Sequence, residues 1–214
     1  MAQIKKLIET LDYDGLRRLL SANPALANKG IAFDEKNPAE AHPLHRICDG
    51  VFCGIYSDEQ ATEIARIFLE HGAHIDGFSL VQKKDTPLIA AASLHAEKVG
   101  MLYADRGANL HHPGCHGGTA LHWAAWTGRE NLVRKLIAAG ADIHKKCIDF
   151  GGTPLLWAVH GYKFGGGKNR HHQIDCVQLL LEAGADKTVT NNEGTPLLGF
   201  LNGEDEAMKA ALLQ

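Results

Sequence analysis

Thr86-Pro87-Leu88-Ile89 and Thr119-Ala120-Leu121-His122 begin two segments that resemble each other at a spacing of 33 residues. The same four-residue phrase recurs, with variations, as His42-Pro43-Leu44-His45, Thr153-Pro154-Leu155-Leu156 and Thr195-Pro196-Leu197-Leu198. Self-similarity at a nearly fixed period is typical of a solenoid, in which each unit buries its apolar face against its neighbours. The sequence therefore predicts an all-α repeat solenoid.

A second phrase, built around Gly-Ala, lies between the copies of the first. It reads His71-Gly72-Ala73-His74, Arg106-Gly107-Ala108-Asn109, Ala139-Gly140-Ala141-Asp142 and Ala183-Gly184-Ala185-Asp186. Threonine followed by proline predicts a helix N-cap and the first helical position. Glycine after an apolar helical run predicts a left-handed residue that ends the helix. Each unit should contain a capped inner helix, an outer helix, a glycine stop and an extended finger.

Together the two phrases resemble those of the ankyrin-repeat family over nearly the whole chain. The resemblance implies stacked helix-turn-helix repeats that bind other proteins. It also implies that His45 and His122, in the histidine position of the motif, brace the backbone between neighbouring repeats. Two positions depart from the pattern. His42 replaces the capping threonine and Ala120 replaces the proline, and we expect each change to weaken a cap.

We expect one domain over residues 1–214, with divergent N-terminal capping helices in 1–33. Two helical patterns, 4–11 and 14–21, belong to this cap, and 30–40 is interpreted as a linker. Repeats are expected at about 37–81, 82–114, 115–148 and 149–190, with a C-terminal capping repeat at 191–214. Any strands should be confined to the fingers near 78–83, 111–118 and 145–151.

The first and fourth repeats are longer than the other two. Spacings between successive cap positions are 44, 33, 34 and 42 residues. The surplus falls between the inner and outer helices, at about 51–60 and 162–171. Such insertions can be neutral loop growth, which costs little closure entropy. They can also form a binding side of the stack, because both contain aromatic residues. The sequence leaves both interpretations open.

Composition favours a protein that works in a reducing, aqueous compartment. The formal net charge is -3 and 22% of residues are charged, so nothing indicates nucleic acid or an anionic membrane as partner. No apolar run approaches the roughly 20 residues that span a bilayer, and the first residues lack a signal-peptide core. Five scattered cysteines favour the cytoplasm. We expect a cytoplasmic monomer.

A finger at 111–116 carries four potential metal ligands, His111, His112, Cys115 and His116. These residue types suit zinc, but they lack a standard two-pair spacing, so we interpret the finger as a loop and expect no metal or other cofactor. Gly165-Gly166-Gly167-Lys168 lacks the flanking residues of a phosphate-binding loop. No nucleophile, base and orienting group share the repeat period, so we expect no catalytic site.

Trp126 is the strongest candidate for contact with a partner protein. It follows the inner-helix motif at an outward position, whereas Trp123 and Trp157 occupy a position that we expect to face the core. The sequence therefore predicts a non-catalytic protein–protein interaction module that uses a concave groove and both insertions. A metal- or small-ligand-responsive adaptor using 111–116 is the alternative. The candidate partner-binding residues are Asp49, Tyr56, Ser93, Trp126, His160, Tyr162, Phe164, Lys168, Arg170 and Asn202.

Overall fold

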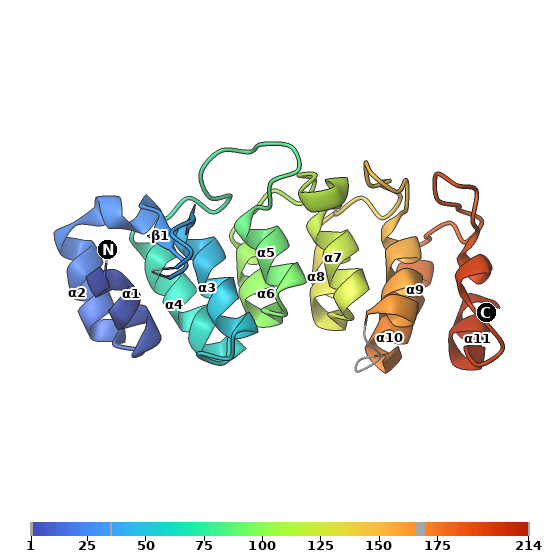
Figure 1. The fold of residues 1–214 in the computed structure, drawn as a ribbon, viewed down its shortest axis with the longest axis horizontal. Coiled ribbons are helices and arrows are strands. Elements are labelled where there is room, and N and C mark those ends of the chain that lie inside the picture. The colour runs from blue at the N-terminus through green and yellow to red at the C-terminus, as the bar shows by residue number, and fades with distance from the viewer. Residues whose placement is uncertain (1, 35, 166–169, 214) are drawn as a thin grey trace. The chain divides into compact units, whose positions relative to one another are not determined.

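The computed structural model describes residues 2–34, 36–165 and 170–213, and almost all of its regular structure is helical (Figure 1). This confirms the predicted all-α fold class. Within these residues, no helix combines the length and the apolar character that crossing a membrane requires. The chain divides into two compact units. Unit 1 comprises Met1–Leu80 and Thr86–Asn109, and unit 2 comprises Val81–Asp85 and Leu110–Gln214.

Unit 1 contains three pairs of helices. In each pair the two helices contact each other, and between pairs α3 packs on α5 while α4 packs on both α2 and α6. Its helices are α1 (Ala2–Glu9), α2 (Tyr13–Ala22), the 3-10 helix η1 (Pro24–Asn28), α3 (Pro43–Phe52), α4 (Asp58–Glu70), α5 (Pro87–Ser93) and α6 (Glu97–Asp105).

Unit 2 follows the same plan. The inner helices α7 and α9 pack together, the outer helices α8 and α10 pack together, and α11 closes the series against α10. Its helices are the 3-10 helix η2 (Cys115–Gly117), α7 (Ala120–Thr127), α8 (Glu130–Ala138), α9 (Pro154–Phe164), α10 (Arg170–Glu182), the 3-10 helix η3 (Leu197–Phe200) and α11 (Glu206–Leu213). Helices thus occur at both ends of the chain where the sequence predicts them.

The repeated phrases cap the inner helices. The hydroxyl oxygens of Thr86 and Thr153 each accept a hydrogen bond from the backbone N–H three residues on, at 3.4 Å. At His42 the imidazole replaces the hydroxyl, and its Nδ1 accepts from the N–H of Leu44 at 3.3 Å. The cap that we expected to be weakened is therefore still made, by a ring nitrogen.

The glycine phrases end the outer helices as predicted. Gly72, Gly107, Gly140 and Gly184 all have φ between 80° and 94°, the left-handed region in which a β-carbon is strained. No atom lies within 4 Å of the position that a β-carbon would take at any of the four. Glycine is therefore required there by backbone conformation and not by lack of space.

The two insertions, at about 51–60 and 162–171, are partly helical and not two simple loops. Residues 51–52, 58–60, 162–164 and 170–171 belong to helices, 53–57 form a non-helical turn, and 166–169 lie outside the described residues. Inner helices α3 and α9 contain 10 and 11 residues, against 7 in α5 and 8 in α7. Outer helices α4 and α10 contain 13 residues each, against 9 in α6 and α8. Extra residues therefore lengthen both helices of the first and fourth repeats.

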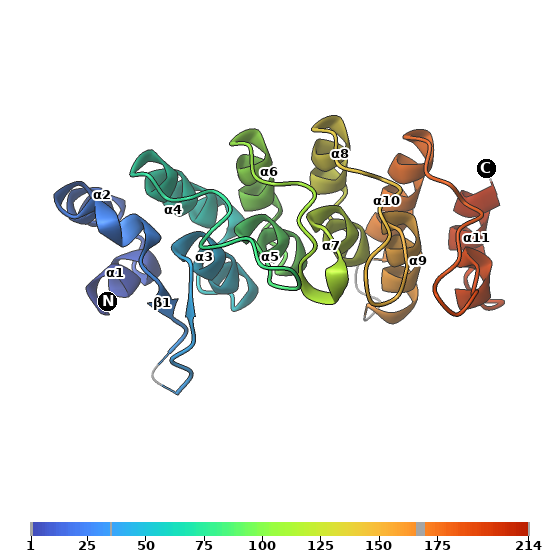
Figure 2. The same cartoon turned by 90° about the horizontal axis from the view of Figure 1, so that it is seen from above.

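The strand pair lies outside the predicted fingers. Strands β1 (Ile31–Ala32) and β2 (Glu40–Ala41) pair antiparallel in the stretch interpreted as a linker. Asp34 closes the turn, because its carboxylate accepts hydrogen bonds from the N–H groups of Lys36 and Asn37 at 2.8 and 2.7 Å. Figure 2 shows this hairpin extending away from the helices of unit 1. The prediction that strands are confined to 78–83, 111–118 and 145–151 is therefore wrong.

Candidate protein-interaction site

A cavity of about 280 Å³ opens on the inner-helix side of unit 2. Six of its lining side chains are tryptophan, phenylalanine or leucine, and the others are two histidines and one asparagine. The lining residues are His116, Trp123, Trp126, Phe150, Leu156, Trp157, His160, Asn191 and Phe200. We call this group the aromatic cavity.

Helices α7 and α9 supply the tryptophans of the aromatic cavity. Trp123 and Trp126 lie one turn apart on α7, and both reach Trp157 on α9. The ring centroid of Trp157 is 5.1 Å from that of Trp123 and 6.0 Å from that of Trp126, with interplanar angles of 80° and 72°. Edge-to-face contacts at these distances are favourable between aromatic rings. The three indoles therefore form a fixed wall and not three independent side chains.

A glycine on α9 permits the close approach of the two inner helices. A β-carbon at Gly161 would lie 2.2 Å from the backbone oxygen of Trp126, well inside any tolerable contact. Because this side chain is missing, α9 lies directly against the backbone of α7. The ring centroids of Trp126 and His160 are then only 4.9 Å apart. Gly161 thus determines the shape of the cavity wall.

We predict that Gly161→Ala lowers the free energy of unfolding by about 1–3 kcal/mol, because the added methyl group forces α9 away from α7. Gly203→Ala is the matched control, since a β-carbon there meets no atom within 4 Å. Chemical denaturation followed by circular dichroism measures both. Equal stability of the two variants would show that the α7–α9 contact is looser than described.

The aromatic surface continues beyond the cavity along α9. The His160 ring lies 4.4 Å from the ring of Phe164 and 5.3 Å from that of Phe200, measured between centroids. Phe164 is 58% exposed, which is unusual for a phenylalanine. Burial lowers the pKa of His160, so its imidazole is neutral at pH 7 and adds no charge to the surface. The cavity and Phe164 together form one apolar, largely uncharged surface, which we call the aromatic surface.

Three of the predicted partner-binding residues belong to this surface. Trp126 and His160 line the cavity and Phe164 extends it. Arg170 begins α10, and its guanidinium carbon lies 5.1 Å from the ring centroid of Tyr162. Asn202 is exposed, although its side-chain oxygen already accepts a hydrogen bond from the N–H of Glu204 at 3.0 Å.

Two predicted contact residues are buried. Tyr56 is 7% exposed and Tyr162 is 5% exposed. The hydroxyl of Tyr56 donates to the backbone oxygen of Ile47 at 3.2 Å, and burial raises its pKa. Tyr56 lies in the turn between α3 and α4, and Tyr162 lies within α9, and both side chains are turned into the protein. They offer little area to a partner.

The remaining candidates lie elsewhere. Asp49 and Ser93 belong to unit 1. The carboxylate of Asp49 pairs with Arg46 at 2.5 Å, and the hydroxyl of Ser93 donates to the backbone oxygen of Ala90 at 3.3 Å. Lys168 lies outside the described residues. In the first insertion Phe52 is 61% exposed and Ile55 is 49% exposed, so both remain available for contact.

Sequence reasoning missed most of the cavity wall. Trp157 is buried as expected for a core position and Trp123 is only partly buried, but both also line the cavity, which was not expected. Phe150 and Phe200 come from a finger and from η3, far apart in the sequence. One signal was available, because all three tryptophans of the chain fall in the inner helices of two successive repeats.

The finger at 111–116 does not assemble a metal site in the described part of the chain. His112 Nε2 hydrogen-bonds the backbone oxygen of Lys84 at 2.9 Å, and His116 Nδ1 pairs with Asp149 at 3.2 Å. His116 then lines the aromatic cavity. Its histidines are thus held by neighbouring fingers, and no three ligand groups of the finger meet.

Comparison with known families settles the nature of the repeats. The chain matches the family described as ankyrin repeats (3 copies) at residues 57–147 and again at 117–191, which together cover more than half of it. The chain belongs to the ankyrin-repeat family. The resemblance inferred from the phrases is thereby confirmed, and protein–protein interaction is the general role of ankyrin repeats.

Known relatives of the repeats include much longer proteins. The chain is 30% identical over 145 residues to palmitoyltransferase ZDHHC13 of Mus musculus, covering 58% of this chain and 22% of that protein. It is 35% identical over 80 residues to palmitoyltransferase AKR1 of Lachancea kluyveri, covering 37% and 10%. It is 30% identical over 90 residues to palmitoyltransferase Hip14 of Drosophila melanogaster, covering 42% and 13%. The chain thus spans about a fifth or less of these relatives.

Proposed function

We propose that this ankyrin-repeat chain is a protein-interaction module that holds an apolar side chain of its partner in the aromatic cavity. The observation that carries the proposal is the cavity itself, with its three indoles and two phenyl rings around about 280 Å³. Cavities that hold small-molecule ligands typically measure about 300–1,000 Å³. A slightly smaller space suits one or two side chains of a protein segment.

The chemistry of the aromatic surface supports this proposal. Tryptophan is the residue type most enriched at interface hot spots, and such anchors lie in well-packed pockets. A partner segment that brings an apolar side chain would fill the space that these aromatic rings line.

The proposed role needs no chemistry by the chain itself. We propose that the module is non-catalytic, monomeric and cytoplasmic, and that its partner is a protein rather than a nucleic acid or a lipid. The relatives named as palmitoyltransferases resemble it in their repeat region and are several times longer. The proposed binding role does not depend on whether the repeats are joined to such an enzyme or act separately. In both cases the repeats would hold another protein.

A displayed library of random peptides, selected against the immobilised chain, tests the proposal by sampling many partner segments at once. Peptides that bind should share an apolar residue, and their affinity is then measured by calorimetry. We expect Trp126→Ala to weaken binding by about 2 kcal/mol or more, which is about 30-fold. The variant should fold, because Trp126 is only partly buried.

Phe52→Ala is the matched control, since it removes an exposed aromatic residue of unit 1. We expect this variant to bind the selected peptides as the wild type does. Peptides that bind Trp126→Ala and the wild type equally would contradict the proposed site. Loss of binding in Phe52→Ala alone would place the interaction on the first insertion instead.

A further inference from the structure

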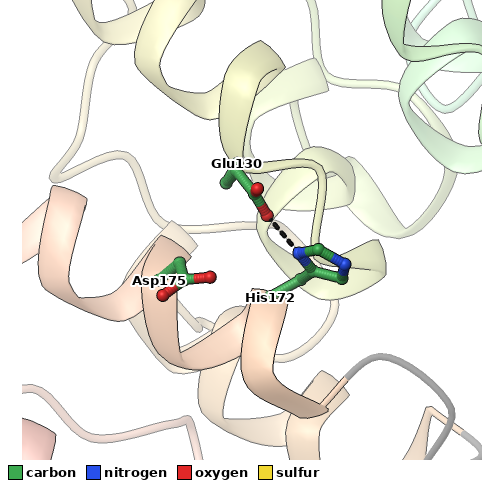
Figure 3. A group of neighbouring side chains, drawn as sticks. All are labelled: Glu130, His172 and Asp175. Carbon is green, nitrogen blue, oxygen red and sulfur yellow. Dashed lines mark hydrogen bonds and ion pairs between the residues drawn. The ribbon is translucent and has the colours of Figure 1, made fainter.

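The outer-helix side of unit 2 carries a second cluster, made of one imidazole and two carboxylates. Glu130 is the first residue of α8, and His172 and Asp175 lie one turn apart on α10. One ligand atom from each of the three lies within 4.8 Å of the others. Figure 3 shows Glu130 and His172 facing each other between the two helices, with the carboxylate of Asp175 beside them. Sequence reasoning did not find this group.

Local packing holds the three side chains in place. Glu130 Oε2 and His172 Nδ1 are hydrogen-bonded. Behind them, a β-carbon at Gly128 would lie 3.0 Å from the β-carbon of His172, so the turn before α8 lies directly against α10. Gly128 has φ of 68°, a conformation that glycine adopts without strain. The approach of the two helices is therefore fixed by backbone contact and not by the charged groups alone.

Charge around the cluster favours a cation. Glu130 and Asp175 line a cavity of about 230 Å³ together with Glu182 and Arg134. Three carboxylates and one guanidinium give these lining groups a formal charge of minus two. Imidazole nitrogen with carboxylate oxygen is a ligand set that suits divalent transition metals, whereas magnesium and calcium prefer oxygen alone. The hollow also leaves room for water to complete the coordination.

We propose that Glu130, His172 and Asp175 bind one divalent transition-metal ion, with zinc as the reference ion, and that the ion links α8 to α10. Tetrahedral zinc places ligand atoms about 3.4 Å apart, from metal–ligand distances of about 2.0–2.1 Å. The three ligand atoms lie within 4.8 Å of one another, so binding would require the side chains to rotate toward this spacing. This proposal is independent of the aromatic surface.

Thermal unfolding of the purified, chelator-treated chain with added zinc chloride tests the site. We expect the melting temperature to rise by about 3–6 °C at ten times the dissociation constant, with no comparable rise in magnesium chloride. His172→Ala should weaken zinc binding by at least about tenfold. His171→Ala is the matched control, because it removes the neighbouring imidazole on the same helix and should leave zinc affinity unchanged.

A cobalt spectrum provides a second readout that does not depend on a variant that folds. Cobalt bound by imidazole and carboxylate lacks thiolate charge-transfer absorption, whereas a site using Cys115 would show it. Absence of saturable zinc binding to the wild type would overturn the proposal, leaving a hydrogen-bonded pair only. Zinc binding that survives in His172→Ala, or that carries a thiolate band, would equally overturn it and place the metal elsewhere.

Discussion

Replacing Trp157 by alanine is expected to lower the free energy of unfolding by about 3–5 kcal/mol. Trp157 is 5% exposed and touches the rings of Trp123, Trp126 and Phe150. Its indole nitrogen also donates a hydrogen bond to Cys147 Sγ at 3.3 Å. The substitution therefore leaves a large void between α7 and α9 and removes the central ring of the cluster. Denaturation by urea, followed by circular dichroism, measures the loss.

Phe164→Ala is the matched control for this prediction. Phe164 lies on the same helix and belongs to the same aromatic surface, but its side chain is mostly exposed. We expect it to change the free energy of unfolding by no more than about 1 kcal/mol, as is usual for exposed positions. If Trp157→Ala were as mild as Phe164→Ala, the indole cluster would not be the core of unit 2.

Acidification from pH 7 to pH 4 is expected to destabilise the chain strongly through His122. Its Nδ1 accepts a hydrogen bond from the N–H of Thr119 at 3.0 Å, and its Nε2 lies 3.2 Å from the backbone oxygen of Gly152. This arrangement requires a neutral ring with its proton on Nε2. Burial lowers the pKa of His122 to about 4, against the ordinary value of 6.5. Protonation would add a proton to Nδ1, which faces the N–H of Thr119. The nitrogen could then no longer accept this hydrogen bond, and the cap would be lost.

The sign of this effect follows from the two pKa values. The stability contributed by neutral His122 is complete above pH 6.5, where the unfolded chain also carries a neutral ring. It falls as the pH drops and is lost near pH 4, by about 3 kcal/mol in total. His42 contributes in the same direction, because burial lowers its pKa to about 4 as well.

His122→Leu isolates the contribution of this residue, since the chain itself uses leucine at the corresponding position 156. Urea denaturation measures the free energy of unfolding at several pH values between 7 and 4. This free energy should fall less steeply with decreasing pH in the variant than in the wild type. The dependence due to His42 should remain. An identical pH dependence in both proteins would show that His122 is not held neutral by the fold.

Much of the fold could be predicted from local sequence. The helix start at Thr86 and the helix stop at Gly140 can each be recognised from a stretch of about four residues. This is possible because an N-cap requires a particular residue type at one position, and so does a left-handed turn. The same local logic predicted that Trp126 faces outward. His42 was predicted to weaken its cap, but its imidazole nitrogen accepts a hydrogen bond from the N–H two residues on, whereas the threonine oxygens accept one from the N–H three residues on.

The rest of the site depends on contacts that no local pattern carries. Phe150 and Phe200 join the aromatic cavity only because a finger and η3, from different repeats, meet there. Tyr162 looked like a loop residue, because the spacing between repeats does not reveal whether surplus residues extend a helix. The cluster around Glu130 also escapes local patterns, since Glu130 on α8 lies 42 residues or more from His172 and Asp175 on α10.

Tryptophan fluorescence during titration with a selected binding peptide tests the central claim most directly. The chain has three tryptophans and all of them line the aromatic cavity, so their emission reports on this site alone. We predict a saturable change in emission whose dissociation constant equals the calorimetric value. Peptide binding by calorimetry without any change in tryptophan emission would contradict the account and place the interaction on another surface.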